Sequence, residues 1–160
     1  MNTVFGENLG KIIALKEVTQ EGLADDSGIK RQTINKAIQI SINNNHNIKI
    51  KTAIALAKGL NVDFPKLFSR LTNEDIKNMG DYIEDDYLDV FVQNVKRSIR
   101  IRGKKQKALS SDPGAKEATV SEILNHKVSD PYLSSIISIS EILNVDIELL
   151  LRRGGLENDF

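Results

Sequence analysis

Apolar residues recur at a helical spacing along most of the chain, and short polar stretches divide them into two series. In the first series they predict helices over residues 4–15, 20–26, 30–40 and 51–59, and a fifth helix after Asp63. Thr19 and Asp63 stand just before helices, where a side-chain oxygen can cap a free backbone N–H. Gly28 separates the second helix from the third, because glycine tolerates the positive φ of a tight turn.

An internal repeat predicts the second series. A shift of 86 positions aligns identical residues in the two halves: Phe5 with Phe91, Asn8 with Asn94, Gln20 with Gln106, Leu23 with Leu109, Gly28 with Gly114 and Thr33 with Thr119. Further along, a shift of 83 aligns LNVD at 60–63 with LNVD at 143–146. The second copy therefore has an apolar helix face over 91–101, a short helix that starts near Gln106, helices over 116–124 and 132–143, and a last helix after Asp146.

These patterns predict an all-α protein with two five-helix domains that form an internal repeat. The first domain covers residues 1–70 and the second covers 89–153. An acidic connector over 71–88 joins them, and residues 154–160 form a flexible tail.

The net charge also differs between the two predicted domains and the segment that connects them. The whole chain has a formal net charge of zero, which by itself argues against a nucleic-acid partner. However, residues 1–70 carry ten Lys and Arg against six Asp and Glu, residues 91–160 carry eleven against nine, and residues 71–90 carry one against seven. Two mildly basic units are thus expected on either side of the acidic segment.

Several classes of protein are excluded by composition. Without Cys there are no disulfides, thiolate zinc sites or thiol nucleophiles. His46 and His126 have no second His or carboxylate at metal spacing, so no metal and no cofactor are expected. We also find no catalytic constellation and expect no enzyme. No apolar run approaches a membrane span and no leader pattern is present, which favours a cytoplasmic protein without a membrane partner.

The stretch TQEGLADDSGIKRQTINKAI, residues 19–38, pairs two short helices around Gly28. This arrangement is typical of a helix-turn-helix, whose second helix enters the DNA major groove. The apolar residues Leu23 and Ile34 fall on the side where the two helices meet. Arg31, Gln32, Asn35 and Lys36 fall on the other side, and these residue types can donate to or pair with base edges.

The sequence resembles the Cro/C1-type (XRE-like) helix-turn-helix family, and it does so twice, over about four fifths of the chain. The first copy carries the elements TQ, LA, SGI, TI and LNVD…LF in order. The resemblance implies that Gln20 touches phosphate. It also implies that Arg31, Gln32 and Lys36 contact bases, with Lys30 and Asn35 beside them.

The second copy departs from the family pattern, with KKQ in place of TQ, Pro113 before the turn, and Ala115 after it. Its three base-contacting positions are Glu117, Ala118 and Glu122, and two acids in a groove lined by phosphates cost electrostatic energy. A basic run from Arg100 to Lys107 is expected to offset this cost by binding the phosphate backbone of the DNA. The expected DNA contacts of this copy are Lys104, Lys105, Gln106, Lys107, Lys116, Glu117, Thr119 and Ser121.

The resulting hypothesis is sequence-specific binding of double-stranded DNA by one chain that acts as an internal pseudo-dimer, most simply as a transcriptional repressor. No small-molecule effector is expected, because no separate domain is left to bind one. One alternative is an accessory protein at a plasmid transfer or replication origin, since the TraN-like transfer proteins of Gram-positive conjugative plasmids are similar in plan. Another is an antitoxin whose first copy reads DNA and whose second copy binds a protein. A homodimer is also open.

Overall fold

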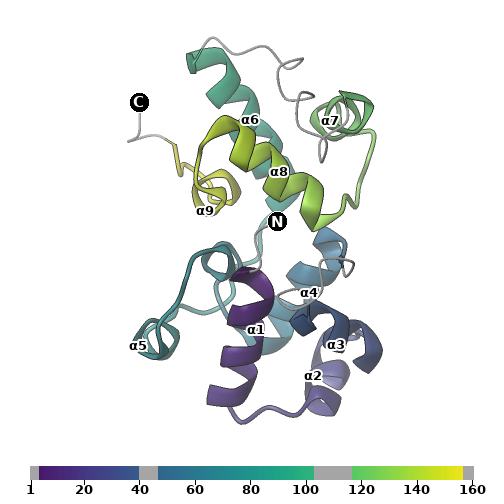
Figure 1. Ribbon diagram of the computed structural model, residues 1–160, viewed down its shortest axis with the longest axis vertical. Helices are drawn as coiled ribbons and strands as arrows, with labels where there is room; N and C mark the ends of the chain where they lie inside the picture. Colours follow the sequence, from purple (N-terminus) through teal and green to yellow (C-terminus); the bar gives the residue numbers. More distant parts are fainter. Residues whose placement is uncertain (1–3, 40–46, 103–116, 157–160) are drawn as a thin grey trace. The chain divides into compact units, whose positions relative to one another are not determined.

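The computed structural model describes residues 4–39, 47–102 and 117–156 (Figure 1). The chain forms two compact units, Met1–Glu84 and Asp85–Phe160, and each has its own core. All regular structure within the described ranges is helical, without a strand, which confirms the expected all-α class.

The described part of unit 1 contains five α-helices and one 3-10 helix: α1 (Val4–Leu15), α2 (Gln20–Ser27), α3 (Arg31–Gln39), α4 (Ile50–Leu60), η1 (Pro65–Phe68) and α5 (Asn73–Lys77). Helix α1 packs on α3, η1 and α5, while α2 packs on α3 and α4. Aromatic rings fill the centre, where Phe68 stacks on Phe5 with ring centroids 5.3 Å apart and meets Phe64 edge-on at 5.4 Å. Of the apolar face that the sequence predicted for α1, Val4, Leu9 and Ile12 are buried, whereas Leu15 at the end of the helix is 40% exposed.

The fifth predicted helix of unit 1 is the short 3-10 helix η1, and Asp63 is not its cap. Phe64 stands at the N-cap position in helical backbone conformation (φ −58°, ψ −50°), and Pro65 follows. The backbone N–H of Asp63 donates instead to the Gly80 carbonyl at 3.0 Å. In unit 2 the corresponding expectation is confirmed, because the Asp146 carboxylate accepts from the Glu148 N–H at 3.0 Å.

Most of the segment predicted as a connector packs on unit 1. Leu71 and Ile76 are only 4% and 5% exposed. Helix α5 is held by a capping box, in which Thr72 Oγ1 accepts from the Asp75 N–H and Asp75 Oδ2 accepts from the Thr72 N–H. The two buried residues, together with the bonds from the Asp63 N–H to the Gly80 carbonyl and from the Tyr82 N–H to Asn61 Oδ1, attach this acidic stretch to unit 1, whose compact fold continues to Glu84.

Unit 2 contains α6 (Tyr87–Arg102), α7 (Glu117–Leu124), α8 (Leu133–Leu143) and α9 (Ile147–Leu151). Helix α6 contacts α7 and α9, and α8 contacts the same two helices. The short helix expected near Gln106 lies outside the described residues. Leu156 is 1% exposed, so the packed chain extends into the segment predicted as a flexible tail.

The two units share several local features at the positions that the sequence shifts align. Asn8 is buried in α1, and its Nδ2 donates to the carbonyls of Leu67 and Ser69. Asn94 in α6 donates in the same way to the carbonyls of Leu150 and Arg152. Helices α4 and α8 have the same length, 11 residues, and end at asparagines in the left-handed conformation, Asn61 (φ 53°) and Asn144 (φ 52°).

Candidate nucleic-acid interface

The turn between α2 and α3 orients the polar helix that the sequence singled out. Thr19 caps α2, with its Oγ1 accepting from the Gly22 N–H at 2.9 Å. At the other end, Gly28 adopts φ 72°, and its N–H donates to the Ala24 carbonyl at 3.0 Å. Ser27 Oγ then accepts from the Ile29 N–H at 3.2 Å, which holds the chain as it enters α3. The backbone N–H groups of Gly28 and Ile29 at this corner thus both have local partners.

Close packing of α4 fixes α2 beneath α3. Gly59 of α4 faces α2 so closely that a Cβ there would lie 3.0 Å from Ser27 Cβ and 3.1 Å from Leu23 Cδ1. Leu23 itself is fully buried. The lack of a side chain at Gly59 therefore allows α2 to sit directly on α4, as sequence reasoning alone did not foresee.

Helix α3 presents the polar face that its sequence predicted. Ile34 and Ala37 are fully buried, which sets the rotation of the helix. Arg31, Gln32 and their neighbours one turn later are exposed on the opposite side. Among the described residues, no hydrogen bond or ion pair engages the side chains of Gln20, Lys30, Arg31, Gln32, Asn35 or Lys36. These donors and acceptors are available to a ligand.

Four of the six expected contact residues of unit 1 line one hollow of about 320 Å³: Gln20, Arg31, Gln32 and Asn35. Gln20 comes from the first turn of α2, and the other three come from α3. Lys30 and Lys36 are exposed but are not among the residues that line the hollow. The fold thus joins the expected phosphate contact at the start of α2 to the expected reading face of α3.

Helix α7 takes the corresponding place in the sequence of unit 2, but its surface differs. Val120 and Ile123 are buried, Thr119 and Ser121 are partly buried, and Glu122 is exposed. Ser121 already has a partner, because Asn125 Nδ2 donates to its carbonyl at 2.8 Å and to its Oγ at 3.2 Å. Glu117 begins the helix. The other expected contacts, Lys104, Lys105, Gln106, Lys107 and Lys116, lie outside the described residues.

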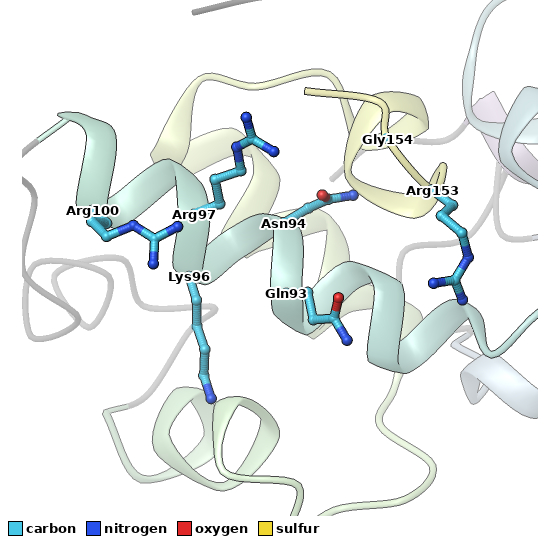
Figure 2. A pocket seen from close by; sticks show the side chains of 7 residues that line it. All are labelled: Gln93, Asn94, Lys96, Arg97, Arg100, Arg153 and Gly154. Carbon is cyan, nitrogen blue, oxygen red and sulfur yellow. The ribbon is translucent and has the colours of Figure 1, made fainter. Parts of the chain in front are cut away.

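A second hollow, of about 460 Å³, lies along α6, and sequence reasoning missed it. It is lined by Gln93, Asn94, Lys96, Arg97 and Arg100 of α6 and by Arg153 and Gly154 after α9 (Figure 2). Arg153 forms a double hydrogen bond to the Asp85 carboxylate, at 2.6 and 3.1 Å. This bond, reinforced by the Asp86 N–H and the charge of Arg153, lowers the pKa of Asp85 despite an opposing effect of desolvation.

Comparison with protein families identifies the region that contains α7 and this hollow. Residues 94–153 match the model of the Cro/C1-type HTH DNA-binding domain. Unit 2 contains a Cro/C1-type domain. The match lies on the copy that sequence reasoning regarded as the more divergent one. No curated protein and no solved structure matches the chain.

The Cro/C1-type domain runs from the middle of α6 to just after α9, so it includes α7, α8 and most of the α6 hollow. Over the part of the chain that the structure describes, no helix has the length and apolar character needed to cross a bilayer. In the same residues, no three His, Asp or Glu side chains converge as metal ligands would.

Proposed function

We propose that the chain binds double-stranded DNA in a sequence-specific manner through two helix-turn-helix units, as an internal pseudo-dimer, and that it represses transcription. The Cro/C1-type domain of unit 2 supports DNA binding directly. For unit 1, the supporting observation is the hollow in which Gln20 at the start of α2 lies beside Arg31, Gln32 and Asn35 of α3.

The chemistry of this hollow suits a base edge beside a backbone phosphate. Arg31 can donate two hydrogen bonds to guanine O6 and N7, while Gln32 and Asn35 can pair with adenine N6 and N7. Gln20 extends from the first turn of α2, close to the N-terminal N–H groups that favour an anion. A phosphate at Gln20 would position α3 in the groove, and the α3 side chains would then select the bases.

Shared details of the two units support the proposal that unit 1 is a second copy of the same domain. The amides of Asn8 and Asn94 bond to carbonyls that the shift of 83 aligns, Leu67 with Leu150 and Ser69 with Arg152. A buried amide with the same two carbonyl partners is a specific arrangement, because a buried donor must find a partner and few geometries provide two.

Binding-site selection from random duplexes, followed by titration of variants, tests the proposal. Arg31→Ala or Gln32→Ala should relax base preference within one half-site and cost about 1–3 kcal/mol of binding to the selected site. Gln20→Ala should weaken selected and random duplexes by the same factor. Lys77→Ala, on the exposed end of α5, serves as the control and should change neither.

Each outcome of this experiment leads to a different conclusion. Equal losses of selected and random binding in Arg31→Ala would mean that α3 does not read bases. Absence of any duplex binding by the unmodified chain would overturn the proposal as a whole. Footprinting on DNA that flanks the gene separates a repressor, which protects a promoter, from a protein that marks a transfer or replication origin.

A further inference from the structure

The α6 hollow gathers cations that none of the described acidic residues pairs with. Lys96 and Arg97 are adjacent in α6, and Arg100 leaves the helix one turn later; in Figure 2 the side chain of Arg97 points up and that of Lys96 points down. Among the described residues, none of the three has a hydrogen-bond or ion-pair partner. Arg153 at the other end is paired with Asp85. The hollow therefore carries three uncompensated positive charges in a space large enough for an anion.

Helix stability does not explain this cluster. A helix C-terminus attracts cations, but the effect falls off within the last turn, and Lys96 lies six residues before the end of α6. Lys96 with Arg100 and Arg97 with Arg100 are like-charge pairs at spacings of four and three residues, and such pairs destabilise an isolated helix. A bound anion would remove this repulsion.

The aligned positions of unit 1 provide an internal comparison. Lys96 aligns with Gly10, Arg97 with Lys11, and Arg100 with Ala14. Lys11 is moreover engaged, since its Nζ donates to the Leu71 carbonyl at 3.3 Å. Unit 1 folds without the cationic cluster, so the packing of α1 or α6 does not require it.

The two expected reading helices, α3 and α7, differ in charge in the opposite direction: here unit 1 has the cations. Helix α3 carries Arg31 and Lys36, whereas the aligned positions of α7 are Glu117 and Glu122. Unit 2 thus has acids on the helix that would face the groove and an excess of cations on α6. The cations span about four residues of α6, or roughly 6 Å along its axis, which is on the order of the spacing between successive phosphates of one strand.

We propose that the α6 hollow of unit 2, formed by Lys96, Arg97 and Arg100 with Arg153 at its other end, is a binding site for the phosphate backbone of DNA. This inference rests on the proposed function. It adds a second surface, separate from α7, through which unit 2 holds the duplex without reading its sequence. Asp85 restrains the site, because it occupies the guanidinium of Arg153.

The test measures binding of the full chain to a random-sequence duplex of about two helical turns, between about 50 and 200 mM salt. Each lost phosphate contact lowers the slope of log affinity against log salt by about 0.9, so Lys96→Gln, Arg97→Gln and Arg100→Gln together should lower it by roughly 2.7. A control chain with Lys66→Gln, Arg70→Gln and Lys77→Gln removes the same charge from η1, α5 and the loop between them, and it should keep the slope. Asp85→Asn releases Arg153 without removing a cation, and it should raise the slope by up to about 0.9.

The outcomes separate this inference from the function on which it rests. If the α6 variant and the control lose slope equally, or if neither loses any, the hollow does not hold DNA phosphate. Unchanged duplex binding together with reduced binding of a poly-glutamate peptide would assign the hollow to an acidic protein segment and overturn the proposal. If the unmodified chain binds no duplex, the proposed function itself fails. An Asp85→Asn chain that binds more weakly than the unmodified one would also contradict the assignment.

Discussion

Asn8 and Asn94 each use a buried side-chain amide to tie the first helix of a unit to the backbone at the end of η1 or α9. Asn8 is 1% exposed, and its Nδ2 lies 2.9 Å from the Leu67 carbonyl and 2.6 Å from the Ser69 carbonyl. These carbonyls end a short helix and have no next turn to donate to them. The amide replaces the missing donors, so its loss would leave buried acceptors unsatisfied.

Replacement of either asparagine by alanine should destabilise the protein by about 1–3 kcal/mol, the cost of buried polar groups without partners. The measurement is urea unfolding followed by far-ultraviolet circular dichroism. Asn78→Ala, at the exposed end of α5, is the control and should cost well under 1 kcal/mol. If Asn8→Ala unfolds at the same urea concentration as that control, the amide does not hold α1 to η1.

Ser98 presents the opposite situation. Its side chain is fully buried in α6, and its hydroxyl has no hydrogen-bond partner among the described residues. The aligned residue of unit 1 is Ile12, which is also fully buried. Ser98→Ala should therefore raise the free energy of unfolding by about 1 kcal/mol, since it removes a desolvated hydroxyl.

Ser140 supplies the matched control for Ser98 in the same unit. It is 5% exposed, and its Oγ donates to the Ile137 carbonyl at 2.7 Å. Ser140→Ala removes a hydrogen bond that is made, so it should leave stability unchanged or lower it by up to about 1.5 kcal/mol. Both variants are compared by thermal unfolding. A Ser98→Ala chain that melts below Ser140→Ala would refute the idea that the Ser98 hydroxyl is unsatisfied.

The ion pair of Asp85 with Arg153 predicts a contribution to the stability of unit 2 that is lost in acid. The hydrogen bond from Arg153 lowers its pKa in the folded state below the ordinary value of 3.8. A carboxyl with a lowered folded pKa contributes stability above its unfolded pKa, and the contribution is lost as pH falls through the folded pKa. Acid unfolding below about pH 4 should therefore be shallower in Asp85→Asn, which cannot ionise. Identical acid transitions in the two chains would show that the Arg153 pair adds nothing to stability.

At the scale of elements, the corner between α2 and α3 depends on the backbone of Gly28. Its φ is 72°, and a Cβ there would meet no atom within 4 Å, so the restriction is conformational and not one of space. Gly28→Ala should cost about 1–2 kcal/mol, because L-residues other than glycine disfavour this region. Gly28→Asn should cost less, since Asn tolerates the left-handed conformation. Equal unfolding midpoints for the two variants would contradict this explanation.

Hydrophobic periodicity was sufficient to predict α1, α3, α4 and α8 because each buries an apolar stripe, whereas α2 buries Leu23 alone and is marked by the cap at Thr19 and the turn at Gly28. It missed α5, because Ile76 within the helix and Leu71 before it are buried but stand in a segment dominated by acids. The capping box at Thr72 and Asp75 was the available signal for that helix. Hydrophobic periodicity also gave no sign that η1 would be a 3-10 helix, since a four-residue element is too short to show a period.

The candidate site was predictable where it depends on one helix and not where it depends on packing. The exposed face of α3 follows from the burial of Ile34 and Ala37, which the apolar pattern indicates. The α6 hollow extends from Arg100 to Arg153, residues far apart in the sequence, because α9 packs against α6. A charge count along the chain therefore detected the basic run from Arg100 to Lys107 but not the cluster of cations that lines the α6 hollow.

At the scale of the whole molecule, the link between the units is short. Tyr82 is still bound to unit 1, because its N–H donates to Asn61 Oδ1 at 3.2 Å, and Glu84 pairs with Lys58 at 3.3 Å. Helix α6 begins at Tyr87. The chain from Tyr82 to Tyr87 can span at most about 18 Å when extended. Because this link is short, the two units should bind together only to DNA sites whose halves are separated by a narrow range of distances.

The difference between the two reading helices predicts the symmetry of the DNA site. A homodimer with identical helices requires a palindrome, because operator symmetry follows protein symmetry. This chain offers RQTINK in α3 and EATVSE in α7, so a single chain on two successive major grooves should prefer a non-palindromic site with one strongly and one weakly specified half. Insertion of about five base pairs between the halves turns the second groove to the opposite face and should abolish the joint contact.

Native mass measurement of the protein with a selected duplex, together with the selected sequences themselves, tests this prediction. One chain per duplex, an asymmetric site and loss of affinity on insertion are expected. Two chains on a perfect inverted repeat would mean that the first units read both halves and the second units hold the dimer together. In that case α7 would contact no DNA bases, and the cations of α6 would bind phosphate away from the helices that read the sequence. The internal pseudo-dimer would then be wrong.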